Sequence, residues 1–147
     1  NVCLNRRARH NYELFDTLEA GIMLVGSEVK SLRHGGASLE EAYVSFDGMG
    51  RPLLMGAHFS PYEQANRQNH EPLRPRPLLL HAAETRKLRM KVREKGLTIV
   101  PVQLYFLGPW CKLEIAVGRG RKLHDKRQAS REAEGKREID RAMNRRG

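Results

Sequence analysis

Two segments with alternating apolar side chains constrain the fold more than any other feature of the chain. In 98–106, TIVPVQLYF, every second side chain from Val100 onward is apolar, and 111–117, CKLEIAV, alternates in the same way from Cys111. Successive side chains of a strand point to opposite faces, so each segment can bury one face. The pattern predicts two strands joined by a turn at LGP. Pro101 has no N–H to donate, so we expect its strand to lie at an edge or to contain a bulge there.

The first third of the chain contains two strand-like runs and then a helix signal. The runs YELFDTL (12–18) and GIMLV (21–25) are apolar enough to pair as a hairpin, with the turn beginning at Glu19. Ser27 is a favourable helix N-cap, and the two glycines that start at Gly35 are a helix stop. We therefore expect a hairpin followed by a short helix.

The middle of the chain mixes strands with a long loop and a second helix. Strands are expected at 42–47 and 52–59, on either side of the turn DGMGR. Residues 60–77 are rich in Pro, Asn, Gln and Arg and have no hydrophobic period, which is typical of a loop. In 78–95 apolar residues recur close to helical spacing, and Gly96 is a favourable C-cap. The second helix is expected there.

Together these elements predict a mainly β fold with helices. Short strands interrupted by helices favour a small antiparallel barrel, and an OB-like barrel flanked by two to three helices is the commonest solution of that kind. We expect this domain to span residues 1–117. The basic tail, residues 118–147, has a small apolar face formed by Ile139, Ala142 and Met143. That face cannot offset the entropy of ordering, so we expect the tail to be disordered in the free protein.

The charge of the chain indicates a polyanionic partner. Lysine and arginine outnumber aspartate and glutamate by 27 to 17 in 147 residues, a net charge of +10. The basic tail holds 11 of the basic and 5 of the acidic residues, a net +6 in a fifth of the chain. Nucleic acid is favoured over a membrane, because no stretch approaches the roughly 20 apolar residues of a spanning helix.

The sequence contains no recognisable catalytic or metal-binding pattern. The 6 histidines are scattered singly, and Cys3 and Cys111 lie far apart without a CxxC spacing. We therefore expect no cofactor and no enzyme activity. A monomer in a reducing cytoplasm, without membrane attachment, fits this composition.

Three basic runs are suited to RNA, which is bound through cations for its phosphates and planar groups for its bases. Each run alone is more often a solvated surface, but three runs around one small barrel favour nucleic acid. The third run is the start of the basic tail. The candidate side chains of the first two runs, NRRARH and RPR, are Arg6, Arg7, Arg9, His10, Arg74 and Arg76.

Four motifs follow one another along the chain: NRRARHNY, LEAGIMLVGSEVKSLRHG, EPLRPRPLLLH and GRGRKLHDKR. In this order and spacing they resemble the small protein B family, the tmRNA-binding (SsrA-binding) proteins of bacteria. The resemblance runs from about Asn5 to the end of the chain. It implies a cytoplasmic adaptor whose OB-like barrel binds the tRNA-like domain of tmRNA and delivers it to stalled ribosomes. This process, trans-translation, rescues the ribosome and tags the unfinished peptide for degradation.

The resemblance implies tmRNA contacts at Asn5, Glu19, Leu79 and Lys112. A carboxylate at Glu19 can accept hydrogen bonds from base amino or ribose hydroxyl groups, although a turn carboxylate is the alternative interpretation. Lys112 alternates away from the apolar face of its strand, so it is free to reach phosphate. Leu79 could instead belong to the core.

The resemblance also implies a ribosomal role for the basic tail, which would become helical in the empty mRNA channel near the decoding centre. The glycines Gly118 and Gly120 either form a hinge or end the strand. Three positions depart from the family pattern: Pro77 replaces an expected lysine, Gly135 replaces an aromatic residue, and Ala142 replaces a larger aliphatic residue. The tail positions that match the family's ribosome-binding region are Arg119, Gly120, Arg121, Lys122, His124, Asp125, Lys126, Arg127, Ala142 and Met143.

Composition alone leaves a second interpretation open, a structural ribosomal or ribosome-assembly protein whose basic tail threads into rRNA. Stoichiometry discriminates between the two. A structural component would accompany most ribosomes, whereas an adaptor would accompany a minority of them and bring tmRNA.

Overall fold

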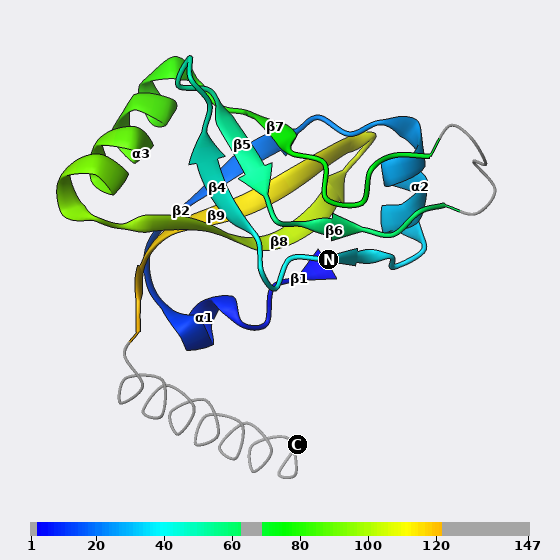
Figure 1. The fold of residues 1–147 in the computed structure, drawn as a ribbon, viewed down its shortest axis with the longest axis horizontal. Helices are drawn as coiled ribbons and strands as arrows, with labels where there is room; N and C mark the ends of the chain where they lie inside the picture. Colours follow the sequence, from blue (N-terminus) through cyan, green and yellow to red (C-terminus); the bar gives the residue numbers. More distant parts are fainter. Residues whose placement is uncertain (1–2, 63–68, 122–147) are drawn as a thin grey trace, which may run out of the picture.

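The computed structural model describes residues 3–62 and 69–121 (Figure 1). Within these residues the chain forms nine strands and three helices. No helix among them is long and apolar enough to cross a membrane. The strands are β1 (Cys3–Leu4), β2 (Tyr12–Ile22), β3 (Ala37–Ser38), β4 (Tyr43–Phe46), β5 (Pro52–Met55), β6 (His58–Phe59), β7 (Arg76–Leu79), β8 (Thr98–Leu107) and β9 (Trp110–Gly120), and the helices are α1 (Ala8–Asn11), α2 (Gly26–Arg33) and α3 (Ala82–Lys95).

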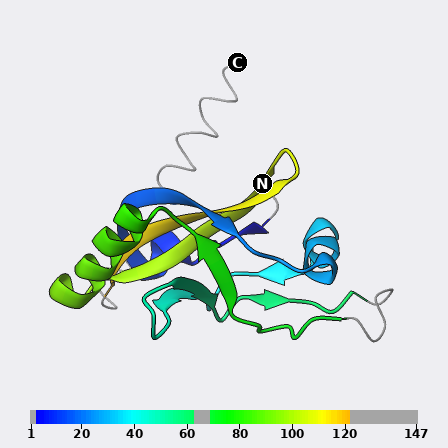
Figure 2. The same ribbon diagram turned by 90° about the horizontal axis from the view of Figure 1, so that it is seen from above.

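Seven strands form one antiparallel sheet that closes on itself. Their order is β1-β8-β4-β5-β7-β2-β9, and β8 also pairs with β9, so the strands from β8 round to β9 form a closed barrel. Helices α2 and α3 lie at opposite ends of this barrel (Figures 1 and 2). The expected mainly antiparallel β fold with flanking helices is confirmed.

Strands β8 and β9 place several apolar side chains in the interior of the barrel, beside others from β2, β4, β5 and β7. Leu104, Leu113 and Ile115 are at most 1% exposed. Burying one such side chain contributes about 1.5–3 kcal/mol of hydrophobic stabilisation. The predicted alternation holds on β9, where Leu113, Ile115 and Val117 belong to the core and the intervening Lys112 lies on the outer face.

A β-bulge in β8 changes which of its side chains face the core. The pairing with β9 skips one residue between Pro101 and Gln103, so Val102 is the extra residue of the bulge. The bulge confirms the expectation at Pro101. However, the bulge also shifts the alternation by one residue. Before the bulge, Ile99 rather than Val100 belongs to the core. The prediction that Val100 shares a face with the later apolar residues of β8 was therefore wrong.

Strand β2 is one continuous strand of 11 residues rather than the expected hairpin. It pairs with β9 from Tyr12 opposite Gly120 to Gly21 opposite Lys112, with one irregularity on the way. The expected turn at Glu19 does not form, because β9 offers this segment a partner along its whole length. Long-range pairing therefore outweighs the local turn signal.

Helix α2 begins at Gly26, so Ser27 lies inside the helix and is not its N-cap. The N-cap is Val25, whose backbone N–H donates to Glu28 Oε1 at 2.8 Å. The Ser27 hydroxyl instead lies 2.8 Å from His70 Nδ1, in a buried hydrogen bond. Ser27 thus ties α2 to the segment that precedes β7.

Helix α3 begins later than expected, because residues 78 and 79 belong to β7 and the helix starts only at Ala82. The Glu84 carboxylate accepts a hydrogen bond from the His81 backbone N–H at 3.1 Å, which fixes the start of the helix. Gly96 ends it in the left-handed conformation, with φ of 64°. The expected C-cap is confirmed.

The expected strand over 52–59 is divided at Gly56 into β5 and β6. Gly56 has φ of 73°, and a Cβ at this position would lie 2.8 Å from the Glu41 carbonyl oxygen. Glycine is the residue that tolerates both the positive φ and the close backbone approach. The loop expected over 60–77 ends earlier, at Arg76, where β7 begins.

We expect Gly56→Ala to lower the free energy of unfolding by about 1–3 kcal/mol, because the added methyl group meets both the strained φ and the Glu41 backbone. Gly26→Ala is the matched control. It lies in α2 with no atom within 4 Å of the added Cβ, so stability should stay constant or rise by up to about 1 kcal/mol. Urea unfolding measures both variants, and equal losses would contradict this account of Gly56.

Candidate nucleic-acid interface

Four neighbouring strands bring distant residues into one row across the outer face of the barrel. Leu79 of β7 lies opposite Gly21 of β2, Gly21 lies opposite Lys112 of β9, and Lys112 lies opposite Tyr105 of β8. Residues directly opposite one another share a face of the sheet. We call Leu79, Gly21, Lys112 and Tyr105 the cross-strand row.

The first member of the cross-strand row is an exposed apolar side chain. Leu79 is 59% exposed, so it does not belong to the core. Its Cβ would be 3.1 Å from a Cβ placed on Gly21. The glycine therefore leaves room for Leu79 to lie over β2 toward Lys112.

Glu19 joins the row because it stands two residues before Gly21 on β2 and so shares its face. It lies within the ladder opposite Glu114, not in a turn. The Tyr105 hydroxyl donates a hydrogen bond to the Glu19 carboxylate, and Gln103 Nε2 donates to Glu114 Oε2 at 3.3 Å. Each carboxylate of this like-charged pair therefore has its own donor.

The titration of Tyr105 follows from this arrangement. Burial raises its pKa to about 12, and the hydrogen bond to Glu19 and the charge of Glu114 act in the same direction. The hydroxyl is therefore protonated and donating at neutral pH. This hydrogen bond holds the Glu19 carboxylate in place. The other acceptor positions of the carboxylate remain available to a ligand.

The chemistry of this face suits a nucleotide. Lys112 supplies a cation for a phosphate, and Glu19 supplies acceptors for amino or hydroxyl groups. Leu79 supplies an apolar surface for a base or ribose. Across residues 3–62 and 69–121, in contrast, no three His, Cys, Asp or Glu side chains come together as a metal site.

The basic run at the N-terminal end forms a separate group. Arg6, Arg7, Arg9 and His10 are exposed, in and just before α1. This run precedes Tyr12, the first residue of β2, whereas Gly21 is nine residues further along the strand, about 30 Å at 3.3 Å per residue. The structure therefore does not join these cations to the cross-strand row.

The start of the basic tail lies beside this basic run instead. Arg119 and Gly120 are part of β9, opposite Glu13 and Tyr12, so the strand continues three residues past Val117. The Arg119 guanidinium lies 5.6 Å from the centre of the exposed Phe15 ring. The Arg121 backbone N–H donates to the Asn11 carbonyl oxygen at 2.8 Å. The remaining tail candidates, Lys122, His124, Asp125, Lys126, Arg127, Ala142 and Met143, lie outside the described residues.

Asn5 is a structural residue in this conformation rather than an exposed RNA contact. Its side chain is buried and its Nδ2 donates to the Pro101 carbonyl oxygen at 2.8 Å. Its backbone N–H donates to the Val102 carbonyl oxygen, also at 2.8 Å. These bonds attach the basic run to the bulge of β8.

Arg76 is also buried, which corrects its assignment as an RNA contact. Its side chain is 0% exposed, and its Nε lies 2.6 Å from Glu28 Oε2. The guanidinium stacks on the Phe59 ring at 4.1 Å and donates to the Ala57 carbonyl oxygen at 2.8 Å. All of these partners are internal, so Arg76 joins α2 to β7 and presents no surface to RNA.

Arg74 is held by the same carboxylate. Its Nη2 lies 2.5 Å from Glu28 Oε1, and its side chain is 30% exposed. Burial acts to raise the pKa of Glu28. The hydrogen bonds from Arg74 and from the Val25 N–H, together with the charge of Arg76, outweigh burial and lower this pKa below its ordinary value. We call Glu28, Arg74 and Arg76 the buried ion cluster.

A comparison with models of protein families shows the family to which the chain belongs. The model of the family described as SmpB protein matches residues 2–145. The chain belongs to the SmpB family. The match also includes most of the basic tail.

Known members of the SmpB family are similar over nearly the whole chain. The SsrA-binding protein of Microcystis aeruginosa is 48% identical over 142 residues, which is 96% of this chain and 92% of that protein. The SsrA-binding protein of Symbiobacterium thermophilum is 51% identical over 143 residues, 97% of this chain and 90% of that protein. A solved structure described as "tmRNA-SmpB: a journey to the center of the bacterial ribosome" superposes with a TM-score of 0.69 at 42% identity, covering 87% of this chain and 93% of that one.

Sequence reasoning missed three residues: Tyr105 and Glu114 on the outer face of the barrel, and Glu28 in the buried ion cluster. Tyr105 and Glu114 were not singled out, although both occupy outward positions of the alternating strands that were predicted. That alternation is the signal that could have found them. Glu28 carried no comparable signal, because its buried partners lie 46 and 48 residues away.

We expect Glu28→Gln to lower the free energy of unfolding by about 3–5 kcal/mol at neutral pH, because it leaves the buried Arg76 without a counter-charge. Glu40→Gln removes an exposed carboxylate 3.7 Å from Arg7 and should change stability by less than about 1 kcal/mol.

The same pair of variants tests the pH dependence. The pKa of Glu28 is lower in the folded state than in the unfolded state. The ionised Glu28 carboxylate therefore makes its full contribution to folding stability when the pH is above the unfolded-state pKa, and this contribution is lost as the pH falls through the folded-state pKa. The difference between wild type and Glu28→Gln in urea unfolding should therefore shrink in acid. A difference that stays constant down to the acid limit of folding would contradict this.

Proposed function

We propose that this protein is a tmRNA-binding adaptor of trans-translation. The barrel binds the tRNA-like domain of tmRNA, and the complex enters stalled ribosomes, where the unfinished peptide is tagged. The observation that carries this proposal is the cross-strand row, which gathers Glu19, Leu79 and Lys112 on one outer face of an SmpB-family barrel. The relatives named SsrA-binding proteins and the solved structure of tmRNA with SmpB support it.

The interaction follows from the chemistry of that face. RNA is read by proteins mainly where unstacked bases and 2′-hydroxyl groups are accessible. Leu79 packs against such a base or its ribose, and Glu19, oriented by Tyr105, accepts from an amino or hydroxyl group. Lys112 neutralises the adjoining phosphate.

The second RNA contact is ribosomal and begins at the other end of β2. Arg119 and Arg121 stand beside α1, whose flanking cations are exposed. The basic tail continues from this point into the mRNA channel and occupies the place of missing mRNA. The role is that of an adaptor between two RNAs, performed by a monomer in the cytoplasm.

The alternative of a structural ribosomal protein is not favoured. Composition alone is compatible with it, but the family model and the relatives named for SsrA binding match nearly the whole chain. Those matches include both the barrel and the tail.

Glu19→Gln provides a sharp test of the cross-strand row. The substitution removes a negative charge, so a purely electrostatic contact would bind RNA more tightly. We expect weaker binding to tmRNA instead, by about 1–3 kcal/mol, because the amide supplies one acceptor oxygen where the carboxylate supplies two. Filter binding at several salt concentrations measures the affinity, with an unrelated RNA hairpin as the comparison RNA.

Lys112→Gln should weaken tmRNA binding and reduce the slope of log K against log salt by about 1. Lys87→Gln on α3 makes the same charge change away from the row and serves as control. The proposed interface is wrong if Glu19→Gln binds tmRNA as tightly as wild type, or if Lys87→Gln and Lys112→Gln lose affinity equally.

Truncation separates the two RNA contacts. A chain ending at Arg121 keeps all pairs of β9 with β2, so it should bind tmRNA as wild type does but should support no peptide tagging in a translation extract. A chain ending at Val117 loses the pairs of residues 118–120 with Leu14, Glu13 and Tyr12 and should also be less stable. If the chain ending at Arg121 lost tmRNA binding and tagging to the same degree, the two contacts would not be separable.

A further inference from the structure

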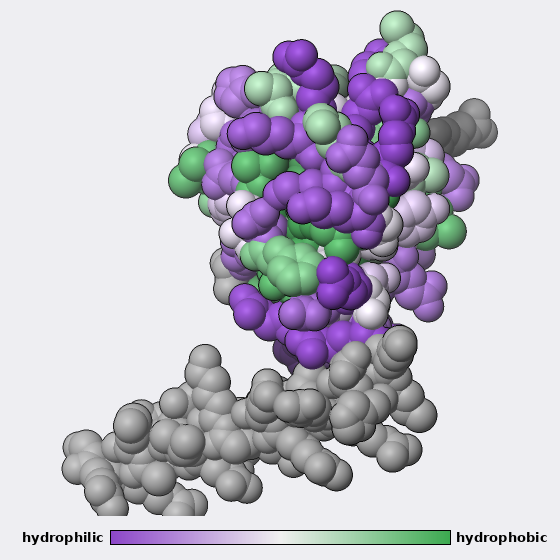
Figure 3. Space-filling model, turned by 90° about the vertical axis from the view of Figure 1, so that its left-hand side faces the viewer, coloured by the Kyte–Doolittle hydropathy of each residue, from purple (hydrophilic) through white to green (hydrophobic). Residues whose placement is uncertain are grey.

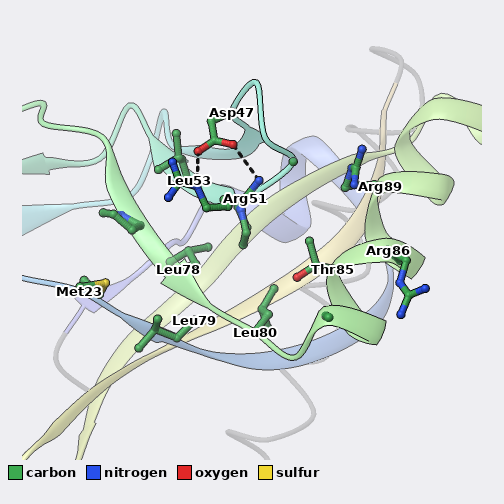
Figure 4. A pocket seen from close by; sticks show the side chains of 14 residues that line it. Met23, Asp47, Arg51, Leu53, Leu78, Leu79, Leu80, Thr85, Arg86 and Arg89 are labelled. Carbon is green, nitrogen blue, oxygen red and sulfur yellow. Dashed lines mark hydrogen bonds and ion pairs between the residues drawn. The ribbon is translucent and has the colours of Figure 1, made fainter.

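A groove runs between α3, β7 and the turn that joins β4 to β5 (Figure 4). Its volume is about 890 Å³, and its floor is apolar, with Leu53, Leu78 and Leu80. A second hollow of about 460 Å³ adjoins it and shares Asp47, Gly50 and Arg89 as lining residues. We call the two adjoining hollows the α3 groove.

Arginine side chains line the α3 groove. Arg86 and Arg89 belong to the first hollow, and Arg89 and Arg93 belong to the second. Among the described residues none of these three forms an ion pair. They lie three and four residues apart, so they follow one side of the helix over about 10 Å.

The opposite side of the α3 groove adds no free negative charge. Asp47 lies there, but Arg51 Nε is 2.9 Å from its Oδ2. The backbone N–H of Arg51 and then its side chain hold the pKa of Asp47 below its ordinary value, although slight burial opposes them. The carboxylate is therefore ionised and neutralised, and the three arginines leave the groove with a net positive charge.

The shape of the turn places one arginine in the groove. Gly50 has φ of 80°, and a Cβ there would lie 2.7 Å from Arg89 Nη1. The glycine thus lets the Arg89 guanidinium lie directly against the turn. In Figure 4 Thr85 and Arg89 of α3 lie on one side of the groove and Arg51 lies on the other, with Leu80 below them and Leu78 on the far side of Arg51 from α3.

The face that carries α3 is mainly hydrophilic, with small hydrophobic areas between the polar side chains (Figure 3). An apolar floor edged by unpaired cations is suited to single-stranded RNA, because bases and riboses can cover the floor while phosphates meet the cations. A double helix would leave the floor uncovered, since its bases are already stacked.

We propose that the α3 groove binds a single strand of tmRNA through Arg86, Arg89 and Arg93. The occupant follows from charge complementarity and from continuity with the cross-strand row, because Leu79 belongs to the row and also lines the groove. A strand that leaves the row at Leu79 therefore enters the groove. This inference rests on the proposed function and extends the tmRNA interface from the sheet to α3.

The test uses the full chain with Arg86→Gln and Arg89→Gln combined, and tmRNA as the probe. Losing two contacts to a single strand should reduce the slope of log K against log salt by about 1.4 and the affinity by about tenfold at physiological salt. Hydroxyl-radical footprinting should show one tmRNA segment that wild type protects and the variant does not.

Two further variants control the experiment. Lys87→Gln with Lys95→Gln makes the same charge change on the side of α3 that faces Asp16 and should lower the affinity less than about threefold. Arg86→Gln with Arg93→Gln keeps Arg89 packed against the turn, so it repeats the test without disturbing that contact. Urea unfolding of each variant shows that the fold is retained.

The outcomes separate this inference from the proposed function. If both arginine pairs bind tmRNA as the lysine pair does, the α3 groove is not part of the interface, and binding of tmRNA through the cross-strand row is left unaffected. If the arginine pairs bind tmRNA normally but associate more weakly with ribosomes, the occupant is ribosomal RNA and the assignment to tmRNA is overturned. If wild type itself fails to prefer tmRNA over an unrelated hairpin, the proposed function fails.

Discussion

Strand β9 pairs with β2 on one side and with β8 on the other over almost its whole length, and the rest of the structure depends on this double pairing. The pairing with β8 closes the barrel and buries the alternating apolar side chains of both strands. The pairing with β2 sets which residues lie opposite one another on the outer face. Lys112 meets Gly21 only in this register, and a slip of one residue would turn it to the core.

The buried ion cluster controls the other side of the same surface. Arg76 begins β7 and is held by Glu28 of α2, so the helix fixes where the strand enters the sheet. From that anchor the strand runs three residues to Leu79, opposite Gly21. A residue that looked like a phosphate contact therefore acts by positioning an apolar one.

The sequence predicted what depends on local pattern. The alternation of β9, the bulge at Pro101 and the left-handed end of α3 at Gly96 all follow from a few neighbouring residues. The alternation of β9 also predicted that Lys112 lies on the outer face. The barrel itself was predicted because short strands of this kind have few ways to cover their edges.

What the sequence could not predict depends on partners far along the chain. Glu19 was placed in a turn because its local neighbours resemble one, but β9 is about a hundred residues away in the chain and pairs with it. Asn5 and Arg76 were assigned to RNA by charge, polarity and resemblance. Their buried partners, Pro101 and Glu28, lie 96 and 48 residues away, so local reasoning could not show that these side chains are internal.

Gly118 and Gly120, at the start of the basic tail, are paired with β2 and neither form a hinge nor come after the end of the strand. A Cβ on Gly118 would lie 3.1 Å from Leu14 Cδ2 and 3.2 Å from Tyr12 Cβ, so this glycine allows β9 to pack closely against β2. Gly120 pairs with Tyr12 and lies within the ladder. A hinge at these positions would require breaking that ladder. The barrel therefore carries its outer face and the start of the basic tail, as far as Arg121, on one continuous pair of strands.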